Sequence, residues 1–199
     1  MTYPFEIPAS WTWATLGEIA EVVGGVTKDS KRQADPSYVE VPYLRVANVQ
    51  RGYLDLSNVS TIRVPEPRAA ALRLQHGDVL LNEGGDRDKL GRGWIWEGQI
   101  QECIHQNHVF RARVEGGVLA PKLLALFANS FGQGWFQQNG LQSVNLASIS
   151  LTAIKNFPVP VPPLAEQQRI VAVLEAVLLR LDAGVANLGA SSARLGRVS

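Results

Sequence analysis

The chain has 199 residues, 46% of them hydrophobic, which is enough to bury the core of one domain and to add an appendage. Its single cysteine excludes a disulfide framework and a cysteine-based zinc site, and it fits the reducing cytoplasm, where we expect the protein to be. The formal net charge of +1 decides nothing about nucleic acid, because a basic face can be balanced by an acidic one.

Neither export nor membrane insertion is predicted. The first twenty residues lack a basic segment followed by an apolar one, which a secretory signal would need. The most apolar run, at Leu174–Leu181, is interrupted by charges and is too short to span a membrane.

The N-terminal part predicts a short strand followed by a short helix. Thr12–Leu16 has the composition of a strand, and Gly17–Val22 reads as a helix that two glycines close. Trp11 and Trp13 are best explained as anchors in a core or an interface.

A polar, basic segment without periodicity follows at Val26–Tyr38 and predicts a loop. Lys28, Lys31 and Arg32 could contact phosphate there, although a short basic loop is commonly just solvated surface.

The middle of the chain alternates strand and turn patterns. Val41–Val49 is rich in β-branched and aromatic residues and predicts a strand, with Arg45 and Asn48 near its end. We expect a short helix over Arg68–Leu74, then a turn, then a buried strand over Asp78–Asn82.

The most distinctive loop runs from Glu83 to Gly93 and combines glycines with charges. Glycines allow a backbone to approach a partner closely. Arg87, Lys89 and Arg92 supply donors for phosphate oxygens or guanine edges. The alternative is a hairpin loop whose acidic and basic side chains pair with each other.

Two further strands are predicted at Trp94–Trp96 and Asn107–Val114. Between them, Cys103, His105 and His108 suggest a metal site, but they occupy strand-like positions without a convincing fourth ligand. We therefore expect no metal. His105 and Asn107 are better explained as a hydrogen-bonded cluster or as polar side chains that face a ligand.

Pro121–Gln138 has helical spacing of its large apolar residues, begins with proline and is followed by Gly140. Next comes a polar loop over Asn139–Ile149. In it Gln142, Ser143 and Asn145 either meet a ligand or cap a short helix near Leu151.

The C-terminal part predicts an extended, proline-rich segment and then a long helix. Pro163 can serve as the first helical residue, and Glu166 in the first turn suits the helix dipole. An apolar seam follows with alternating steps of three and four residues, which is heptad spacing. Its members are Val171, Leu174, Leu178, Leu181, Val185, Leu188 and Leu195. Because no second helix of this kind is present, we expect a homodimer; the alternative is a helix that folds back on its own domain.

The sequence lacks the motifs of several enzymes. There is no phosphate-binding loop ending in Gly-Lys-Ser/Thr, no Asn/Asp-Pro-Pro-Tyr/Phe tetrad of an adenine methyltransferase and no nucleophile elbow. We expect a non-catalytic protein without a cofactor.

Several segments resemble one family, the specificity subunit of type I restriction–modification systems. These are an opening with Ile7-Pro8, two tryptophans and Leu-Gly-Glu-Ile-Ala; the run Leu-x-x-Gly-Asp-Val-Leu-Leu at Leu74–Leu81; and Phe-Pro-Val-Pro-Val-Pro followed by Pro-Leu-Ala-Glu-Gln-Gln-Arg-Ile-Val at Phe157–Val171. The resemblance covers nearly the whole chain.

The resemblance implies an α/β (α+β) fold with a twisted mixed sheet. Residues 1–162 would form a target-recognition domain, and residues 163–199 a spacer and dimerisation helix of the coiled-coil kind. It also implies double-stranded DNA as ligand, with adenine methyltransferase subunits and a restriction (translocase) subunit as partners. The residues expected to contact DNA are then Lys28, Lys31, Arg32, Arg45, Asn48, Arg87, Lys89, Arg92, His105, Asn107, Gln142, Ser143 and Asn145.

Family members carry two such halves in tandem, whereas this chain has one, so we expect the homodimer to read a symmetric, two-part site. The main alternative is a dimeric coiled-coil scaffold or regulator without a role in DNA modification. Such a protein would bind no DNA, and charge reversal at Arg87, Lys89 and Arg92 would leave its partner binding unchanged.

Overall fold

The computed structural model describes residues 5–30, 32–142 and 147–195, with the side chain of Arg32 and several of the C-terminal helix outside the description. The backbone falls into two compact units, Met1–Pro162 and Pro163–Ser199. Within the described ranges, no helix has both the length and the apolarity that crossing a membrane requires.

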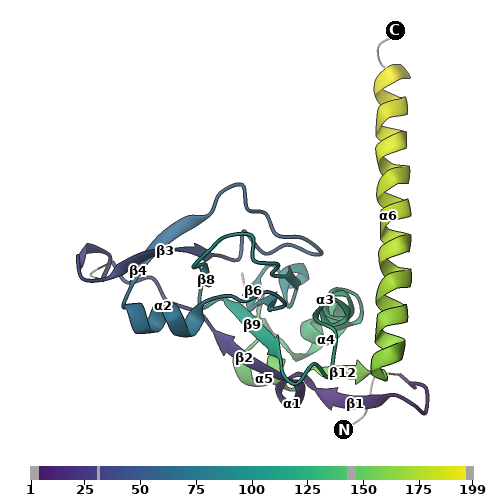
Figure 1. The fold of residues 1–199 in the computed structure, drawn as a ribbon, viewed down its shortest axis with the longest axis horizontal. Helices are drawn as coiled ribbons and strands as arrows, with labels where there is room; N and C mark the ends of the chain where they lie inside the picture. Colours follow the sequence, from purple (N-terminus) through teal and green to yellow (C-terminus); the bar gives the residue numbers. More distant parts are fainter. Residues whose placement is uncertain (1–4, 31, 143–146, 196–199) are drawn as a thin grey trace. The chain divides into compact units, whose positions relative to one another are not determined.

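The centre of the first unit is an antiparallel sheet with the strand order β2–β9–β5–β7. Two of these strands, β2 and β9, are labelled in Figure 1. Its strands are Ala20–Gly24, Val109–Val114, Val79–Asn82 and Gly93–Ile95, respectively. All four residues of β5 are buried, as the apolar run in the sequence predicts. Val79 and Leu81 pack in one hydrophobic cluster and Leu80 in another, so both faces of this strand are covered.

Helices cover one face of this sheet and supply most of the main core. They are α1 (Leu16–Ile19), α3 (Pro121–Asn129), α4 (Phe131–Asn139) and α5 (Leu151–Lys155). Leu124 of α3, Phe136 of α4 and Ile154 of α5 are fully buried against strand residues such as Ala112. This packing confirms the apolar stripe expected over residues 121–138.

A second group of strands has its own small core (left in Figure 1). Strands β4 (Ser60–Val64), β3 (Val39–Leu44) and β8 (Ile104–His105) form a mixed sheet, in which β3 pairs antiparallel with β4 and parallel with β8. Helix α2 (Glu66–Leu72) packs on it through Ala69 and Leu72. The expected α/β fold with a mixed sheet is therefore confirmed.

Two smaller sheets complete the unit. Strand β1 (Thr12–Thr15) pairs antiparallel with β12 (Pro158–Val161), which joins the two ends of the unit. Strands β10 (Leu141–Gln142), β11 (Ala147–Ser148) and β6 (Gly84–Gly85) form the other sheet.

Four sequence predictions about elements need correction. The helix expected over Gly17–Val22 ends at Ile19, because the following residues join β2. The strand expected over Val41–Val49 ends at Leu44, and the chain then continues in turns. The helix expected to run unbroken from Pro121 is interrupted at Ser130, whose hydroxyl donates to the Leu126 carbonyl at 2.9 Å. The loops at 83–93 and 139–149 contain β6, β10, β11 and a 3₁₀ turn, Arg87–Lys89.

A tight turn at 104–109 connects the two larger sheets. Its first residues pair with β3, and its end begins β9. Inside the turn, the Nδ1–H of His105 donates to the Val109 carbonyl at 2.6 Å, and the ring is fully buried. Burial lowers the pKa of His105 to about 4, so the imidazole is neutral at pH 7.

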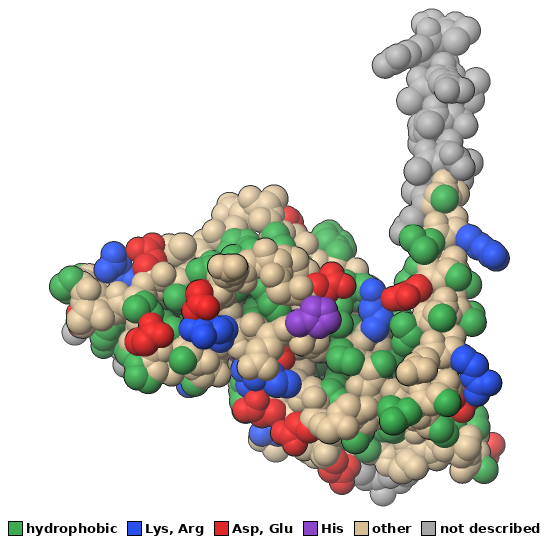
Figure 2. Space-filling model, viewed as in Figure 1, with side chains coloured by type: hydrophobic (Ala, Val, Ile, Leu, Met, Phe, Trp, Pro, Cys, Tyr) green, Lys and Arg blue, Asp and Glu red, His purple; other side chains and the backbone are tan. Residues whose placement is uncertain are grey.

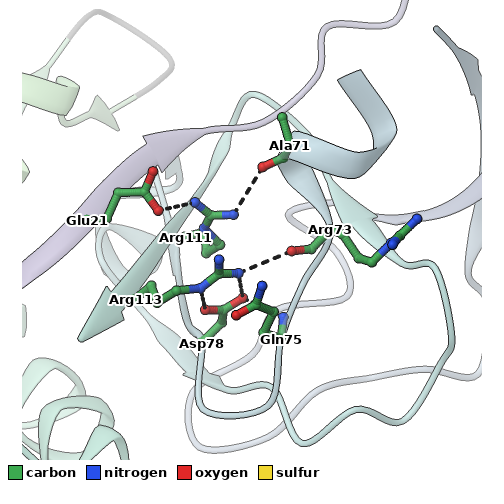
Figure 3. Close-up of polar contacts among 7 residues, drawn as sticks. All are labelled: Glu21, Ala71, Arg73, Gln75, Asp78, Arg111 and Arg113. Atoms are coloured by element: carbon green, nitrogen blue, oxygen red, sulfur yellow. Dashed lines mark hydrogen bonds and ion pairs between the residues drawn. The ribbon is translucent and has the colours of Figure 1, made fainter. Parts of the chain in front are cut away.

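A buried polar network fastens β9 to the segment after α2 (Figure 3). Arg113 donates to both carboxylate oxygens of the buried Asp78, at 2.7 Å from Nε and 2.8 Å from Nη2. Arg113 also donates to the carbonyl of Arg73, and the Gln75 N–H donates to Asp78. Beside it, the buried Arg111 pairs with Glu21 of β2. The aspartate of the Gly-Asp-Val-Leu-Leu run is thus a structural group.

The second unit is one helix, α6 (Leu164–Leu195), with Glu166 in its first turn as expected. Leu178 and Leu181 of the predicted seam are exposed, as are Val173, Val177 and Leu179 outside it (Figure 2). The apolar surface is therefore wider than a strict two-position seam. The side chains of Val185, Leu188 and Leu195 lie outside the described part of the helix.

We predict that Asp78→Asn lowers the free energy of unfolding by about 3 kcal/mol, because it leaves the guanidinium of Arg113 without its counter-charge inside the protein. Urea unfolding followed by circular dichroism measures this loss. Glu102→Gln is the matched control, since its partner pair with Arg73 is largely exposed and should contribute less than about 1 kcal/mol. Equal effects of the two substitutions would contradict the prediction.

We also predict that stability falls as the pH drops from about 6.5 to about 4. The unfolded His105 takes up a proton below its ordinary pKa of 6.5, whereas the buried ring does so only near 4. The full effect is roughly 3 kcal/mol. His105→Gln should flatten the difference in unfolding free energy across this window, measured by urea titration. His76→Gln, at an exposed histidine, should retain the wild-type pH dependence; a wild-type slope in His105→Gln would refute the assignment.

Candidate nucleic-acid interface

A cleft of about 660 Å³ opens where the small sheet β10–β11–β6 meets the turn at 104–109. Its walls come from five separate segments of the first unit. The residues that line the cleft are Val46, Glu83, Gly84, Gly85, His108, Leu141, Gln142, Ala147 and Ser148.

Close backbone packing forms one wall of the cleft. The Glu83 N–H donates to the His108 carbonyl at 2.9 Å, and the Glu83 carbonyl accepts from the Ile149 N–H at 2.8 Å. A Cβ atom on Gly84 would lie 2.6 Å from the Ala147 carbonyl oxygen, so β11 can pair at this position only with glycine. Gly84 of the 83–93 loop therefore allows β6 and β11 to lie close together.

Three polar side chains are linked at the cleft, of which Glu83 and His108 line it. His108 Nδ1 lies 2.7 Å from a Glu83 carboxylate oxygen, and the Asn107 amide nitrogen lies 3.2 Å from His108 Nε2. His108 is about half exposed. Sequence reasoning named Asn107 as a candidate but missed the Glu83–His108 pair, because residues 25 positions apart give no local pattern.

The basic residues of the 83–93 loop differ in availability. Lys89 pairs with Asp86, and this hydrogen bond holds the pKa of the Asp86 carboxyl below its ordinary value. Arg92 is half-buried, and burial lowers its pKa, although Asp88 opposes the shift. Arg87 is exposed. The loop thus combines the two readings of its sequence: one ion pair within it and one outward-facing guanidinium.

Contacts that the sequence did not predict hold this loop in place. The Arg51 guanidinium donates to the carbonyls of Asn129 and Asp88 at 2.7 and 2.8 Å. The Asn129 amide accepts from the Gly93 N–H at 3.0 Å and donates to the Gly93 carbonyl at 2.7 Å. Gly91 has a φ of +62°, and a Cβ there would lie 2.0 Å from the Phe136 ring. The loop is therefore a packed element.

Two of the predicted DNA contacts, Asn48 and His105, have buried side chains that bond to the protein's own backbone. Asn48 accepts from the Arg45 N–H at 2.9 Å and donates to the carbonyls of Asp55 and Asn58, so it shapes the loop after β3. His105 closes the turn at 104–109. The sequence does not show whether a given amide or imidazole side chain bonds to the protein's own backbone or to a ligand.

The other predicted contacts differ in exposure and in position. Arg45 is half-buried next to Val46 of the cleft, Gln142 lines the cleft and is exposed, and Lys28 is exposed after the bridge between Val26 and Gln106. Arg32 begins a 3₁₀ turn, but its side chain is outside the description. Lys31, Ser143 and Asn145 lie outside the described residues.

The chemistry of this surface is hydrogen bonding with charges of both signs. In the face shown by Figure 2, acidic and basic side chains are interspersed. Amides and carboxylates can pair with base edges, and guanidinium groups with guanine or phosphate. Burial raises the pKa of the Cys103 thiol to about 12, and no group of three metal-ligating side chains gathers in the described ranges.

The chain is similar to four curated proteins and to several solved structures. The chain is 27% identical over 172 residues to the type I restriction enzyme MjaX specificity subunit of Methanocaldococcus jannaschii, covering 85% of this chain and 40% of that protein. It is 21% identical to the EcoEI specificity subunit of Escherichia coli, over 86% of this chain and 30% of that protein. The chain thus spans less than half the length of these relatives.

Solved structures share the fold. A chain from a structure concerned with assembly and conformational transition of the type I R-M system superposes with a TM-score of 0.69 at 18% identity, over 98% of this chain and 45% of that one. The HsdS subunit from Thermoanaerobacter tengcongensis gives 0.60 at 18% identity, over 90% of this chain and 40% of that one. A family model, the type I restriction modification DNA specificity domain, matches residues 8–186, which include most of both units, and the chain therefore belongs to this family.

Proposed function

We propose that this chain recognises the DNA target of a type I restriction–modification system. The family match over residues 8–186 carries the proposal. The cleft supports it, because amide, carboxylate and imidazole groups lie there beside a loop with an outward-facing arginine. Such groups read base edges, while arginine and lysine side chains bind the backbone.

The accessible candidates divide by chemistry. The half-buried Asn107 and the exposed Gln142 carry amides suited to adenine, whereas the exposed Arg87 is suited to guanine or phosphate. Lys28 is a backbone contact in this proposal. Lys89 is a weaker candidate, since Asp86 already neutralises it.

The chain itself catalyses nothing in this proposal. Adenine methyltransferase subunits and a restriction subunit would carry out the chemistry, and this chain would direct them to a site on double-stranded DNA. The relatives are named as specificity subunits of restriction enzymes, which agrees with this division of labour. No cofactor or metal is required for recognition of this kind.

We infer further that two copies associate through α6. Leucine and valine side chains exposed along a helix are unfavourable in water, and pairing with a second copy would cover them. A helix of 32 residues is about 48 Å long at a rise of 1.5 Å per residue. This length is sufficient to separate two recognition units by about one turn of DNA, roughly 34–36 Å.

The function is tested by the methylation pattern of DNA incubated with this chain and a candidate methyltransferase subunit, read base by base. We expect methylated adenines within a two-part symmetric motif, because identical units related by a two-fold axis read identical half-sites. The methyltransferase subunit without this chain is the control and should give no such motif.

Other patterns would contradict separate parts of the proposal. An asymmetric motif would mean that a second, different recognition unit is required, which contradicts the homodimer. Absence of both methylation and DNA binding would contradict the recognition function and favour a scaffold.

The homodimer is tested with Leu178→Asp. A buried aspartate without a partner would disfavour the helix pair, so we expect the mass measured by light scattering to fall from a dimer to the 21.7 kDa monomer. Ala176→Asp introduces the same charge two residues away, outside the seam, and should leave a dimer. A dimeric Leu178→Asp variant, or a monomeric wild type, would contradict the pairing through α6.

A further inference from the structure

A second, smaller pocket of about 430 Å³ lies in the group of strands around β3 and has a polar lining. It is formed where the segment after β2 meets the end of β4 and the start of α2. We call it the arginine pocket. Its lining includes Gly25, Thr27, Gln33, Tyr38, Arg63 and Arg68.

Its side chains are mainly hydrogen-bond donors. Arg63 and Arg68 contribute guanidinium groups with five N–H donors each, and Thr27 and Tyr38 contribute hydroxyls. Each guanidinium uses one of its nitrogens in the contacts seen here: Arg63 with Glu40 at 3.3 Å, and Arg68 with the Gly25 carbonyl at 3.3 Å. Most of their donors are therefore available to a ligand.

No acidic side chain lines the pocket among the described residues. The carboxylate that pairs with Arg63, Glu40, is half exposed, and it also accepts from the Thr61 hydroxyl. Two positive charges next to hydroxyl donors suit an oxyanion, and arginine matches the geometry of phosphate oxygens in particular.

Backbone hydrogen bonds hold the walls of the pocket in place. The Gln33 side chain accepts from the Arg63 N–H at 2.9 Å and donates to the Arg63 carbonyl at 3.1 Å, so it fastens the edge of β4. On the other side, a Cβ on Gly25 would lie 1.9 Å from the His105 carbonyl oxygen. This close approach lets the Val26 N–H donate to the same carbonyl at 2.9 Å. The pocket is thus preorganised.

The same backbone joins the arginine pocket to the cleft. Val26 forms a bridge with Gln106, and the Asn107 N–H donates to the Val26 carbonyl at 2.9 Å. Asn107 and His108 lead directly into the cleft, whereas Thr27 lines the pocket. A nucleic acid held by Asn107 would therefore have its backbone close to this pocket.

We propose that the arginine pocket binds a phosphate group, and that this phosphate belongs to the backbone of the DNA. The second part rests on the proposed function. A phosphate contact of this kind fixes the position of the recognition unit on the duplex without reading sequence.

The DNA arm compares Arg68→Gln and the double variant Arg63→Gln/Arg68→Gln with wild type, each with the methyltransferase subunit. Anisotropy titrations use a duplex with the methylated motif and one with scrambled sequence. We expect Arg68→Gln to weaken binding to both duplexes by about 5- to 10-fold near 0.1 M salt and to reduce the salt slope by about 1, with an unchanged motif. Arg73→Gln is the control, because it removes an arginine of the same region outside the pocket.

The second arm titrates inorganic phosphate into the chain alone and follows the backbone amide signals of residues 25–27 by NMR. We expect shifts in wild type and Arg73→Gln that are lost in the double variant. Phosphate shifts without any loss of DNA affinity would overturn the DNA backbone as the source and leave free phosphate or a nucleotide. No shifts, with equal DNA affinity of Arg68→Gln and Arg73→Gln, would overturn the pocket itself. If wild type binds no DNA, the proposed function fails, and the phosphate titration still decides the pocket.

Discussion

The turn at 104–109, closed by the hydrogen bond from His105 to the Val109 carbonyl, is the constraint on which the rest of the first unit depends. Its backbone pairs with β3 on one side, bridges to Val26 and then starts β9 of the central sheet. The two larger sheets therefore share one short segment. Because the imidazole is buried and neutral, a substitution of His105 would disturb the turn and, through it, the walls of both the cleft and the arginine pocket.

The arginines of this protein have different structural roles, which the net charge of +1 does not show. The buried Arg111 pairs with the half-exposed Glu21, and Arg113 pairs with the buried Asp78, so both arginines hold β9. Arg51 carries no ion pair in the described contacts; it fastens the 83–93 loop through two carbonyls. In the proposed function, affinity for DNA would come from groups that neither role uses, such as Arg87 and the guanidinium groups of the arginine pocket. The overall composition therefore does not reveal a nucleic-acid ligand.

The two units differ in how they bury apolar side chains. The first unit packs its apolar side chains in buried clusters, whereas α6 leaves leucines and valines exposed. Exposed apolar side chains beyond the heptad seam, at Val173 and Val177, widen the surface that a partner would cover. In the proposed function, recognition and association would therefore fall to separate parts of the chain.

Local patterns in the sequence were sufficient for the fold class, for β5, β9, β12 and the long helix, and for the family, since short-range periodicity, prolines and contiguous motifs determine these features. They did not reveal the break at Ser130 or the pairing of β6 with β11. They also did not reveal that Asn48 is buried whereas Asn107 is partly exposed. Those features depend on residues distant in sequence: Glu83 with His108, Arg51 with Asn129, Gly25 with His105. Whether an amide, an imidazole or a guanidinium faces a ligand or the protein's own backbone is decided by such contacts, and only the tertiary structure brings them together.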